Sequence, residues 1–578
     1  MKHIRTSSVF YIILFILLVV EGGGLPASRL ISLHLLLYAP LLLFFAVPFA
    51  RQSIRLPYQI TLWALLFITA VFAGTFHAVN IQISFEHRLL YGSLFLTWIF
   101  VYNVRKKLEK HFLLFIAVST VTMVFYALII RYFLPENFSF LQTSMTFQFA
   151  SGTHGGHDPM GAFLLIPLAV MLPQALYSFS KISIFLSLSL LFLLFYSFLR
   201  SAYLSVVGIL LVFGRTISLK THKNIALFGA LLFIVMVSAL LVTSKLPVEI
   251  PVISNAYNLI LKDSRFEYNK STIAVRADIL QQAFSSIKEH PLTGIGSFNF
   301  YYASMQHAKS VILLTGTSHN IFLDIAVENG IPAGLFFLIL ITLLLVNSRH
   351  AITSLDIDKR SVFALFLALL ILFQFSQHHK MYFLLVLFFL SSAFVYSEKK
   401  EIVMKSKWLL IACIVLSLSN TLIISSKMMA KYQRPALALS IYPLYSFAYQ
   451  SSALDEYNQG HFKLSKQTLE QYAKLYSRDP LALNFIGDTY VLMNDERNAL
   501  KYYNLTLTYN PLAFSTVKSR YLAEKNLYGK EIAAQSLYDY LHSEAKIQES
   551  YLDDDTALFH EWCKQEQLMC PDTDSPIE

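Results

Sequence analysis

Charged residues are scarce in this chain. Asp, Glu, Lys and Arg make up 14% of its 578 residues, and hydrophobic residues make up 55%, whereas about 25% of the residues of a soluble protein are charged. This composition excludes a wholly water-soluble globule. Cysteine is scarcer still, and three cysteines cannot build a disulfide scaffold. Cys413 lies in an apolar run, and whether Cys563 and Cys570 form a bridge stays open.

Nucleotide-binding signatures are missing as well. The chain has no GxxxxGK[ST] loop and no dinucleotide-binding glycine fingerprint, so ATP-driven transport and nicotinamide chemistry lack support. The net charge of +10 does not indicate nucleic-acid binding, because it divides into +15 over residues 1–426 and −5 over residues 427–578. Since basic residues gather in the cytoplasmic loops of membrane proteins, we expect a polytopic membrane domain (1–426) followed by a soluble domain (427–578).

Long apolar runs fill the first of these domains. A bilayer core about 30 Å thick needs about 20 apolar residues per helix, and the sequence predicts an all-α membrane protein with about 13 transmembrane helices. The predicted segments begin near Val9, Leu30, Tyr58, Leu89, Phe112, Met160, Ile182, Ala202, Ile225, Ile321, Val362, Met381 and Trp408. The first 28 residues also fit a cleaved signal peptide, because a basic head, a short apolar stretch and small residues follow one another.

The distribution of basic residues orients these helices. With the N-terminus in the cytoplasm, the predicted cytoplasmic pieces carry nineteen Lys and Arg residues, and the short external connections carry five, which are Arg29, Arg88, Arg131, Arg200 and Lys380. The reverse orientation would invert this bias. The long loop 245–319 and the domain 427–578 are therefore expected on the external side of the membrane.

The external C-terminal domain carries the signature of a helical repeat. From Leu483, residues Ile486, Gly487, Tyr490, Ala499, Tyr503 and Pro511 stand at offsets close to those of a tetratricopeptide repeat, and a looser helix pair precedes them. Such stacked helices usually bind other proteins. A cap that merely stabilises the outer face is an equal alternative, and the acidic tail around Asp553 to Asp555 is interpreted as a solvated surface.

Polar residues concentrate at predicted membrane boundaries. Arg200 lies between two apolar runs, where an arginine is most often an interfacial anchor. Arg276 is predicted to open an amphipathic helix, which Pro291, Gly294 and Gly296 end. Its apolar stripe would hold Ile273, Ile279, Leu280, Ala283, Phe284 and Ile287. His319 and Asn320 precede the run from Ile321, with Ser318 as the expected helix cap, and Gly330, Pro332 and Gly334 predict a bend in that run.

These segments together resemble a known family. FLRSA around Arg200, the stretch from Arg276 to HPLTGIGSFNF, and SHNIFLDIAVENGIPAG from Ser318 resemble the O-antigen ligase and polymerase superfamily, which includes protein O-oligosaccharyltransferases. The resemblance covers about Met160 to Phe394. It implies a GT-C type glycosyltransferase of the bacterial inner membrane that needs no metal or other cofactor, with 245–319 as its external catalytic loop. The donor would be a glycan on undecaprenyl diphosphate, and the acceptor a lipid or a protein.

The resemblance also assigns roles to residues. Arg200 and Arg276 correspond to the family's arginines and His319 to its histidine, although many members have Ser-Arg-Gly or Ser-Arg-Ser where this chain has Leu199, Arg200 and Ser201. Guanidinium groups suit the phosphate oxygens of a departing diphosphate. An imidazole suits the removal of the acceptor proton near neutral pH. Asn320 would orient the histidine or the acceptor, Lys309 and His307 could touch the donor phosphates, and direct displacement predicts inversion at the anomeric carbon.

Other polar motifs are interpreted without a catalytic or metal-binding role, apart from one pair of histidines. His154, His157 and Asp158 mimic a metal site, but their spacing fits no zinc pattern well. Asp356 and Asp358 mimic a DxD motif, yet they are predicted on the cytoplasmic side, in a charged loop. His378 and His379 are predicted to line the acceptor entrance.

Several functions remain open at this level. The leading hypothesis is transfer of a finished glycan to lipid A core, a surface protein or another envelope polymer. A polymerase that extends a lipid-linked chain needs the same diphosphate site. A transporter or flippase is less favoured, since no inverted repeat with paired broken helices is apparent.

Overall fold

The computed structural model of the chain describes residues 53–74, 77–133, 159–178, 180–196, 199–214, 264–310, 313–354, 356–398, 400–405, 407–543 and 562–566, with a few isolated positions. The predicted segments from Leu30 and Ile225, and most of the one from Val9, therefore lie outside the described residues, as do His154, His157, Asp158 and Cys570. Cys413 is free and Cys563 is disulfide-bonded.

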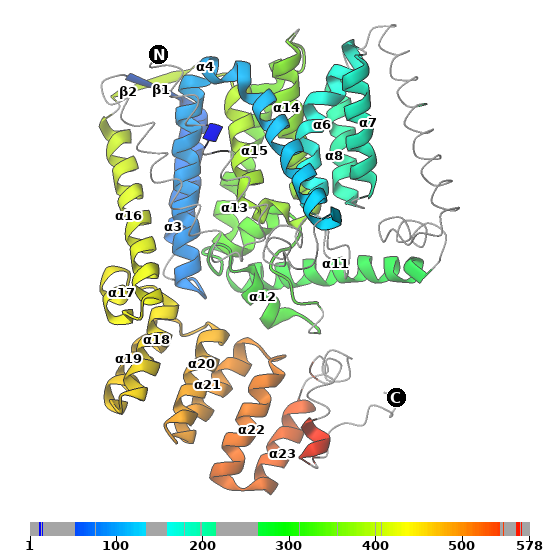
Figure 1. The fold of residues 1–578 in the computed structure, drawn as a ribbon. Helices are drawn as coiled ribbons and strands as arrows, with labels where there is room; N and C mark the ends of the chain where they lie inside the picture. The colour runs from blue at the N-terminus through cyan, green and yellow to red at the C-terminus, as the bar shows by residue number, and fades with distance from the viewer. Residues whose placement is uncertain are drawn as a thin grey trace.

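The described chain is helical apart from one short ribbon. Strand β1 (Ser53–Pro57) pairs antiparallel with β2 (Glu401–Lys405), with Arg55 opposite Val403. The helices of the apolar region, which we call the apolar body, stand side by side in Figure 1. They are α3 (Tyr58–Ala73), α4 (Ile81–Phe133), α6 (Pro159–Ser178), α7 (Lys181–Tyr196), α8 (Arg200–Gly214), α13 (Ile321–Ser348), α14 (Ile357–Phe375), α15 (Tyr382–Val395) and α16 (Lys407–Lys431).

Most predicted apolar segments coincide with these helices. Two of the described helical stretches, Ile321–Ala351 and Lys407–Lys431, are long and apolar enough to cross a membrane, and six others are apolar but shorter. The count of about 13 stays a prediction. The segments predicted from Leu89 and Phe112 both lie on α4, and residues 105–111 between them contain no Gly or Pro that would end the helix. The helix bends sharply at the end of the bundle near β1 (Figure 1), so Trp98 and Phe112 on its two arms both contact the last turn of α15.

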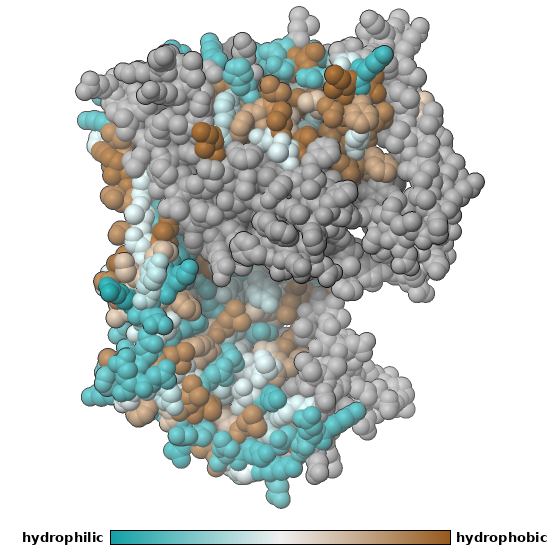
Figure 2. Space-filling view, in the orientation of Figure 1, coloured by the Kyte–Doolittle hydropathy of each residue, from teal (hydrophilic) through white to brown (hydrophobic). Residues whose placement is uncertain are grey.

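The exposed side of α16 shows why this region needs an apolar solvent. One face of this helix exposes large apolar side chains that recur every three or four residues. They are Trp408, Ile411, Val415, Leu418 and Leu422. Figure 2 shows hydrophobic residues along the upper half of the molecule and mostly hydrophilic residues over the C-terminal helices below. An apolar stripe of this length facing water would be unfavourable, so it favours contact with lipid.

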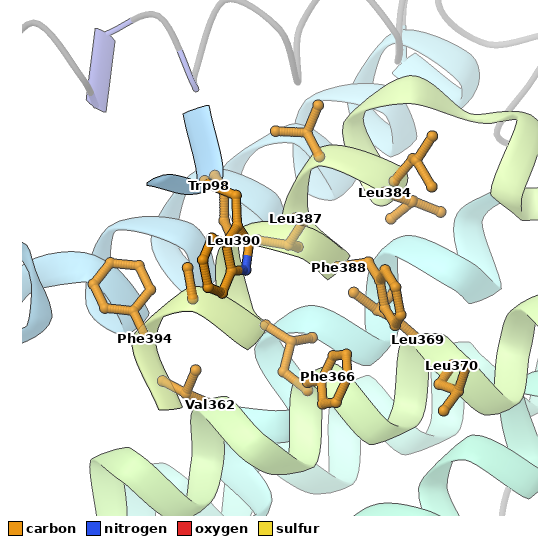
Figure 3. Close-up of a cluster of buried hydrophobic side chains, with 14 of the residues drawn as sticks. Trp98, Val362, Phe366, Leu369, Leu370, Leu384, Leu387, Phe388, Leu390 and Phe394 are labelled. Carbon is orange, nitrogen blue, oxygen red and sulfur yellow. The ribbon is translucent and has the colours of Figure 1, made fainter. Parts of the chain in front are cut away.

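The core of the apolar body lies between α4, α14 and α15. Figure 3 shows Trp98 of α4 against the side chains of α15, with Phe366 of α14 and Phe388 of α15 packed together. The Phe366 and Phe388 rings are 4.9 Å apart. The indole nitrogen of Trp98 donates to Ser392 Oγ at 3.0 Å, so even its polar atom is satisfied inside the core.

Two helices lie across one end of the bundle. They are α11 (Ser264–Glu289) and α12 (Phe300–His307). The prediction that Arg276 opens the first of them was wrong, because α11 begins twelve residues earlier, where no Gly or Pro interrupts the chain. The predicted single stripe also divides, since Ile279 and Ala283 are buried whereas Leu280 and Phe284 are exposed.

The turn Pro291–Gly296, which follows α11, is inserted into a break in α13. The break lies at Gly330, which has φ +85, as the glycines and Pro332 predicted. The amides of Ile295 and Gly296 donate to the carbonyls of Val327 and Glu328 at 3.1 and 2.7 Å. The turn therefore supplies hydrogen bonds at the break, and it fixes α11 against α13.

The C-terminal helices form antiparallel pairs below this end of the bundle. They are α17 (Pro435–Ile441), α18 (Ser446–Asn458), α19 (Phe462–Leu475), α20 (Pro480–Leu492), α21 (Glu496–Tyr509), α22 (Phe514–Tyr528) and α23 (Lys530–Leu541). A Cβ at Gly487 would lie 2.6 Å from the Tyr503 ring, and Ala499 is buried. These close approaches occur where the repeat pattern expects them, while the tetratricopeptide assignment itself stays a prediction.

A buried carboxylate connects these helices to the apolar body. Asp479 caps α20, and its Oδ2 accepts hydrogen bonds from Asn80 Nδ2 at 2.8 Å and from the Tyr302 hydroxyl at 3.0 Å. Burial raises the pKa of Asp479 to about 6, although hydrogen bonds from Ala482, Tyr302 and Asn80 oppose the shift. The contact joins the start of α4, helix α12 and the C-terminal helices.

We expect this contact to weaken with rising pH. Because the folded pKa of Asp479 lies above its ordinary value of 3.8, the carboxyl's contribution to stability is fully present below about pH 4 and is lost as pH rises through about 6. Two pKa units correspond to about 3 kcal/mol. Asp479→Asn keeps a capping side chain and should remove this part of the pH dependence of thermal unfolding. Equal pH profiles for both proteins in detergent would contradict the assignment.

Candidate functional site

The last residues of α14 bring two predicted site segments together. Arg276 Nη2 of α11 donates to the carbonyl of Phe375 at 3.5 Å. Asn320 Nδ2 donates to Gln374 Oε1 at 3.1 Å. Because Gln374 and Phe375 are neighbours, Arg276 and the segment that carries His319 both lie against the same end of α14.

Arg200 begins α8, which lies antiparallel to α14. The Tyr177 hydroxyl donates to the carbonyl of Phe213 at 3.4 Å and accepts from Arg360 Nη1 at 3.0 Å, so the end of α8 lies near the start of α14. The start of α8 is therefore at the same end of the bundle as Phe375. The Arg200 side chain lies outside the described part of the chain, and its meeting with Arg276 stays a prediction.

The segment from Ser318 to Asn320 forms a tight turn before α13. Asn320 caps the helix, since its side-chain oxygen accepts from the amides of Phe322 and Leu323 at 3.0 and 3.1 Å. The prediction of Ser318 as the cap was wrong, because the Ser318 hydroxyl donates to Asp324 instead. His319 has φ +60, in the left-handed region that non-glycine residues seldom adopt. The predicted contact of Asn320 with substrate stays a prediction.

Lys309 lies beside α11, where it pairs with Asp278, two residues after Arg276. Its Nζ is 3.4 Å from Asp278 Oδ1, and about half of its side chain is exposed. His307 is paired with Glu289 at 3.4 Å, farther along the same helix. Lys309 is thus held beside α11 with an exposed side chain, and its predicted contact with a phosphate stays a prediction.

Sequence reasoning missed a buried cluster of charge beside this turn. Asp324 is 1% exposed and lies 2.7 Å from His379 Nε2, and Lys380 pairs with Glu328 one helical turn further on. The ammonium of Lys380 also lies 4.2 Å from the Phe298 ring centroid. The available signal was an Asp and a Glu four residues apart in an apolar run, since ionisable residues at membrane depth are functional candidates.

The same cluster corrects the prediction for the adjacent histidines. His378 and His379 were expected to line an open entrance, but they are 1% and 5% exposed. His379 faces inward because the short 3-10 turn η5 (Gln377–Lys380) follows the end of α14 directly and aims its ring at α13. A carboxylate inside the bundle attracts such a partner, since an unpaired buried charge is costly.

The DxD motif of Asp356 and Asp358 lies far from the site. Asp356 caps α14 by accepting from the amides of Asp358 and Lys359, and it pairs with Lys359 at 3.6 Å. This places the DxD motif at the opposite end of α14 from Arg276, in a charged turn as the sequence indicated. Among the described residues no group of three His, Cys, Asp or Glu side chains stands close enough to hold a metal ion.

A second buried cation has no counter-charge in the part of the chain that the structure describes. Arg88 of α4 is fully buried, and none of its three guanidinium nitrogens has a hydrogen-bond partner among the described residues. Its Nη2 lies near Gly74, at the end of α3. A buried charge without a partner costs several kcal/mol, so Arg88 lowers the stability of the bundle.

Replacing Arg88 with methionine should therefore stabilise the protein. Arg88→Met removes the uncompensated charge while keeping a long side chain, and we expect the free energy of unfolding to rise by about 1–4 kcal/mol. Thermal unfolding in detergent measures this. Arg55→Met is the control, since Arg55 is 71% exposed in a weak pair with Glu401 and should change little. A lower Tm for Arg88→Met would show that the guanidinium has a stabilising partner.

The comparison with known proteins agrees with this arrangement. Residues 185–338 match the family model described as O-Antigen ligase. The match runs from α7 to the middle of α13 and includes Arg200, Arg276 and His319. No curated protein and no solved structure matches the chain. Residues 185–338 therefore carry a domain of the O-antigen ligase family, whose members are membrane-associated, and this domain supports a place in the O-antigen ligase and polymerase superfamily.

Proposed function

We propose that this protein transfers a glycan from undecaprenyl diphosphate to an acceptor hydroxyl at the external face of the bacterial inner membrane. The observation that supports this most is the convergence of Arg276 and the His319 turn on the end of α14, within the segment that matches the O-antigen ligase family. The end of the bundle with β1 and β2 carries Arg55, Arg105 and Lys405 and would face the cytoplasm. The site lies at the other end.

The proposed reaction is a direct displacement. The acceptor oxygen forms a bond to the anomeric carbon as the bond from that carbon to the diphosphate oxygen breaks. The His319 imidazole takes the hydroxyl proton, and the bonding electrons leave with undecaprenyl diphosphate. Arg276, together with Arg200, would stabilise the negative charge that grows on the departing phosphate, so that no metal ion is needed. One displacement inverts the anomeric carbon.

The roles of His319 and Arg276 are testable in purified protein. We expect His319→Ala to lower the transfer rate about 10²–10⁴-fold, because a general base contributes that much. Arg276→Ala should lower it strongly, and Arg276→Lys should recover only part, because an ammonium cannot make the paired bonds of a guanidinium. Lys359→Ala, at the far end of α14, is the control. Transfer at the wild-type rate by His319→Ala would refute the proposed base.

Stacked helices that can bind other proteins favour a ligase with a bulky acceptor, and the C-terminal helices also pack on the site. Ala308, Leu313 and Leu314, which precede the His319 turn, pack in one cluster with Leu512 and Phe514 of the C-terminal region. Deleting residues 450–578 would thus remove support for the site as well as any docking surface. The acceptor question therefore needs the intact chain.

The products of the intact chain separate the three hypotheses. When lipid-linked glycan is the only substrate, a ligase should leave the length of the glycan unchanged. A polymerase should instead build a series of progressively longer glycans on the lipid carrier. With acceptor added, we expect one glycan per acceptor site and free undecaprenyl diphosphate by mass spectrometry. A ladder without acceptor would favour the polymerase, and an intact diphosphate linkage under all conditions would favour a transporter.

A further inference from the structure

The backbone at His319 needs an explanation. Its φ of +60 places a non-glycine residue in the left-handed region, which costs roughly 1–3 kcal/mol and persists only where the surroundings over-determine it. The residue after it is fixed, because Asn320 caps α13. The residues before it need an equally strong restraint.

Asp324 supplies that restraint. Its Oδ1 accepts from the Ser318 amide at 2.6 Å and from the Ser318 hydroxyl at 2.5 Å. Its Oδ2 accepts from the Thr317 hydroxyl at 2.5 Å. Thr317 Oγ1 in turn accepts from the His319 amide at 3.1 Å. One carboxylate therefore holds both residues before His319, and it reaches the His319 backbone through Thr317.

The carboxylate is itself held in place from another helix. His379 Nε2 lies 2.7 Å from Asp324 Oδ2, and its Nδ1 faces the Ser376 carbonyl at 3.3 Å. The ammonium of Lys380 is 3.7 Å from the same Oδ2. Charge-assisted bonds of this kind are stronger than neutral ones, so the end of α14 fixes Asp324 and, through it, the turn.

Ordinary helix capping does not account for these bonds. In a capping box an acidic residue at the third helical position accepts from the amide of the cap. Asp324 is the fourth helical residue after the cap Asn320, and it bonds the two residues that precede His319. Its hydrogen bonds serve the turn outside the helix and not the orphan amides of the helix.

We propose that Asp324, oriented by His379, is a positioning residue that sets the His319 backbone and so aims the imidazole at the acceptor hydroxyl. This inference rests on the proposed function of His319. It requires no contact of Asp324 with substrate. Since a misplacement of about 1 Å can cost 10²-fold in rate, loosening the turn should slow the chemical step and spare donor binding.

The test uses kcat and KM of the purified full-length protein with a lipid-linked glycan and an acceptor. We expect Asp324→Asn to lower kcat about 10–100-fold and to leave the KM for the donor within about threefold of wild type. Glu86→Gln removes a buried carboxylate of α4 that pairs with Lys427 of α16 at 2.7 Å, outside the Asp324 network, and should keep kcat near wild type. A loss that appears only in KM, or equal losses of kcat in both variants, would overturn the proposal.

A double-mutant cycle separates positioning from other roles. If Asp324 acts only through His319, then Asp324→Asn in the His319→Ala background should cause no further loss. If the double variant instead showed the product of the two single-variant losses in kcat, the positioning role would be overturned. Wild-type transfer by His319→Ala would instead refute the proposed function itself, so the two failures are distinguishable.

Thr317 gives a second test if Asp324→Asn does not fold. Thr317→Val keeps the shape of the side chain but removes the oxygen between Asp324 and the His319 amide, and it should lower kcat at least fivefold. Thr317→Ser keeps the hydroxyl and should restore the wild-type value. Equal rates for the two variants would contradict the proposed link.

Discussion

The structure depends on the insertion of the turn at Pro291–Gly296 into the break of α13. Irregular backbone inside an apolar bundle must find hydrogen-bond partners within the protein, and the amides of Ile295 and Gly296 bond the carbonyls of Val327 and Glu328. The approach is close, because a Cβ on Gly330 would lie 2.2 Å from the Leu292 carbonyl oxygen. This contact fixes α11, which carries Arg276, against the helix that His319 precedes.

Buried charges mark the same end of the bundle. Asp324 with His379, and Glu328 with Lys380, are paired, whereas Arg88 has no partner among the described residues. Desolvation makes even paired charges poor contributors to stability. A cluster of them at membrane depth therefore indicates function, and the geometry agrees, since the Asp324–His379 pair holds the turn that carries His319. The C-terminal helices complete this end by packing on the segment before the turn.

Local features were predictable from sequence. Apolar runs predicted helices such as α3 and α13, and Gly330 with Pro332 predicted the break, because run length and backbone preference are properties of neighbouring residues. Errors arose where distant residues compete. Ser318 looked like a cap until Asp324 took its hydroxyl, and His379 looked like an entrance residue until the same carboxylate drew it inward. Arg276 seemed to open a helix whose start lies earlier, at Ser264.

The sequence by itself determined the apolar character of the body, the asymmetric distribution of charge and the superfamily of residues 185–338, since composition and ordered motifs need no knowledge of packing. Only the tertiary structure decided that Arg276 and Asn320 meet at the end of α14, and that Asp324 governs the backbone at His319. The physical reason is that some of these contacts join residues about a hundred positions apart, which only the packing of the helices brings together. Others depend on the Ser318 hydroxyl, which could cap α13 or bond Asp324, and the folded structure selects the second.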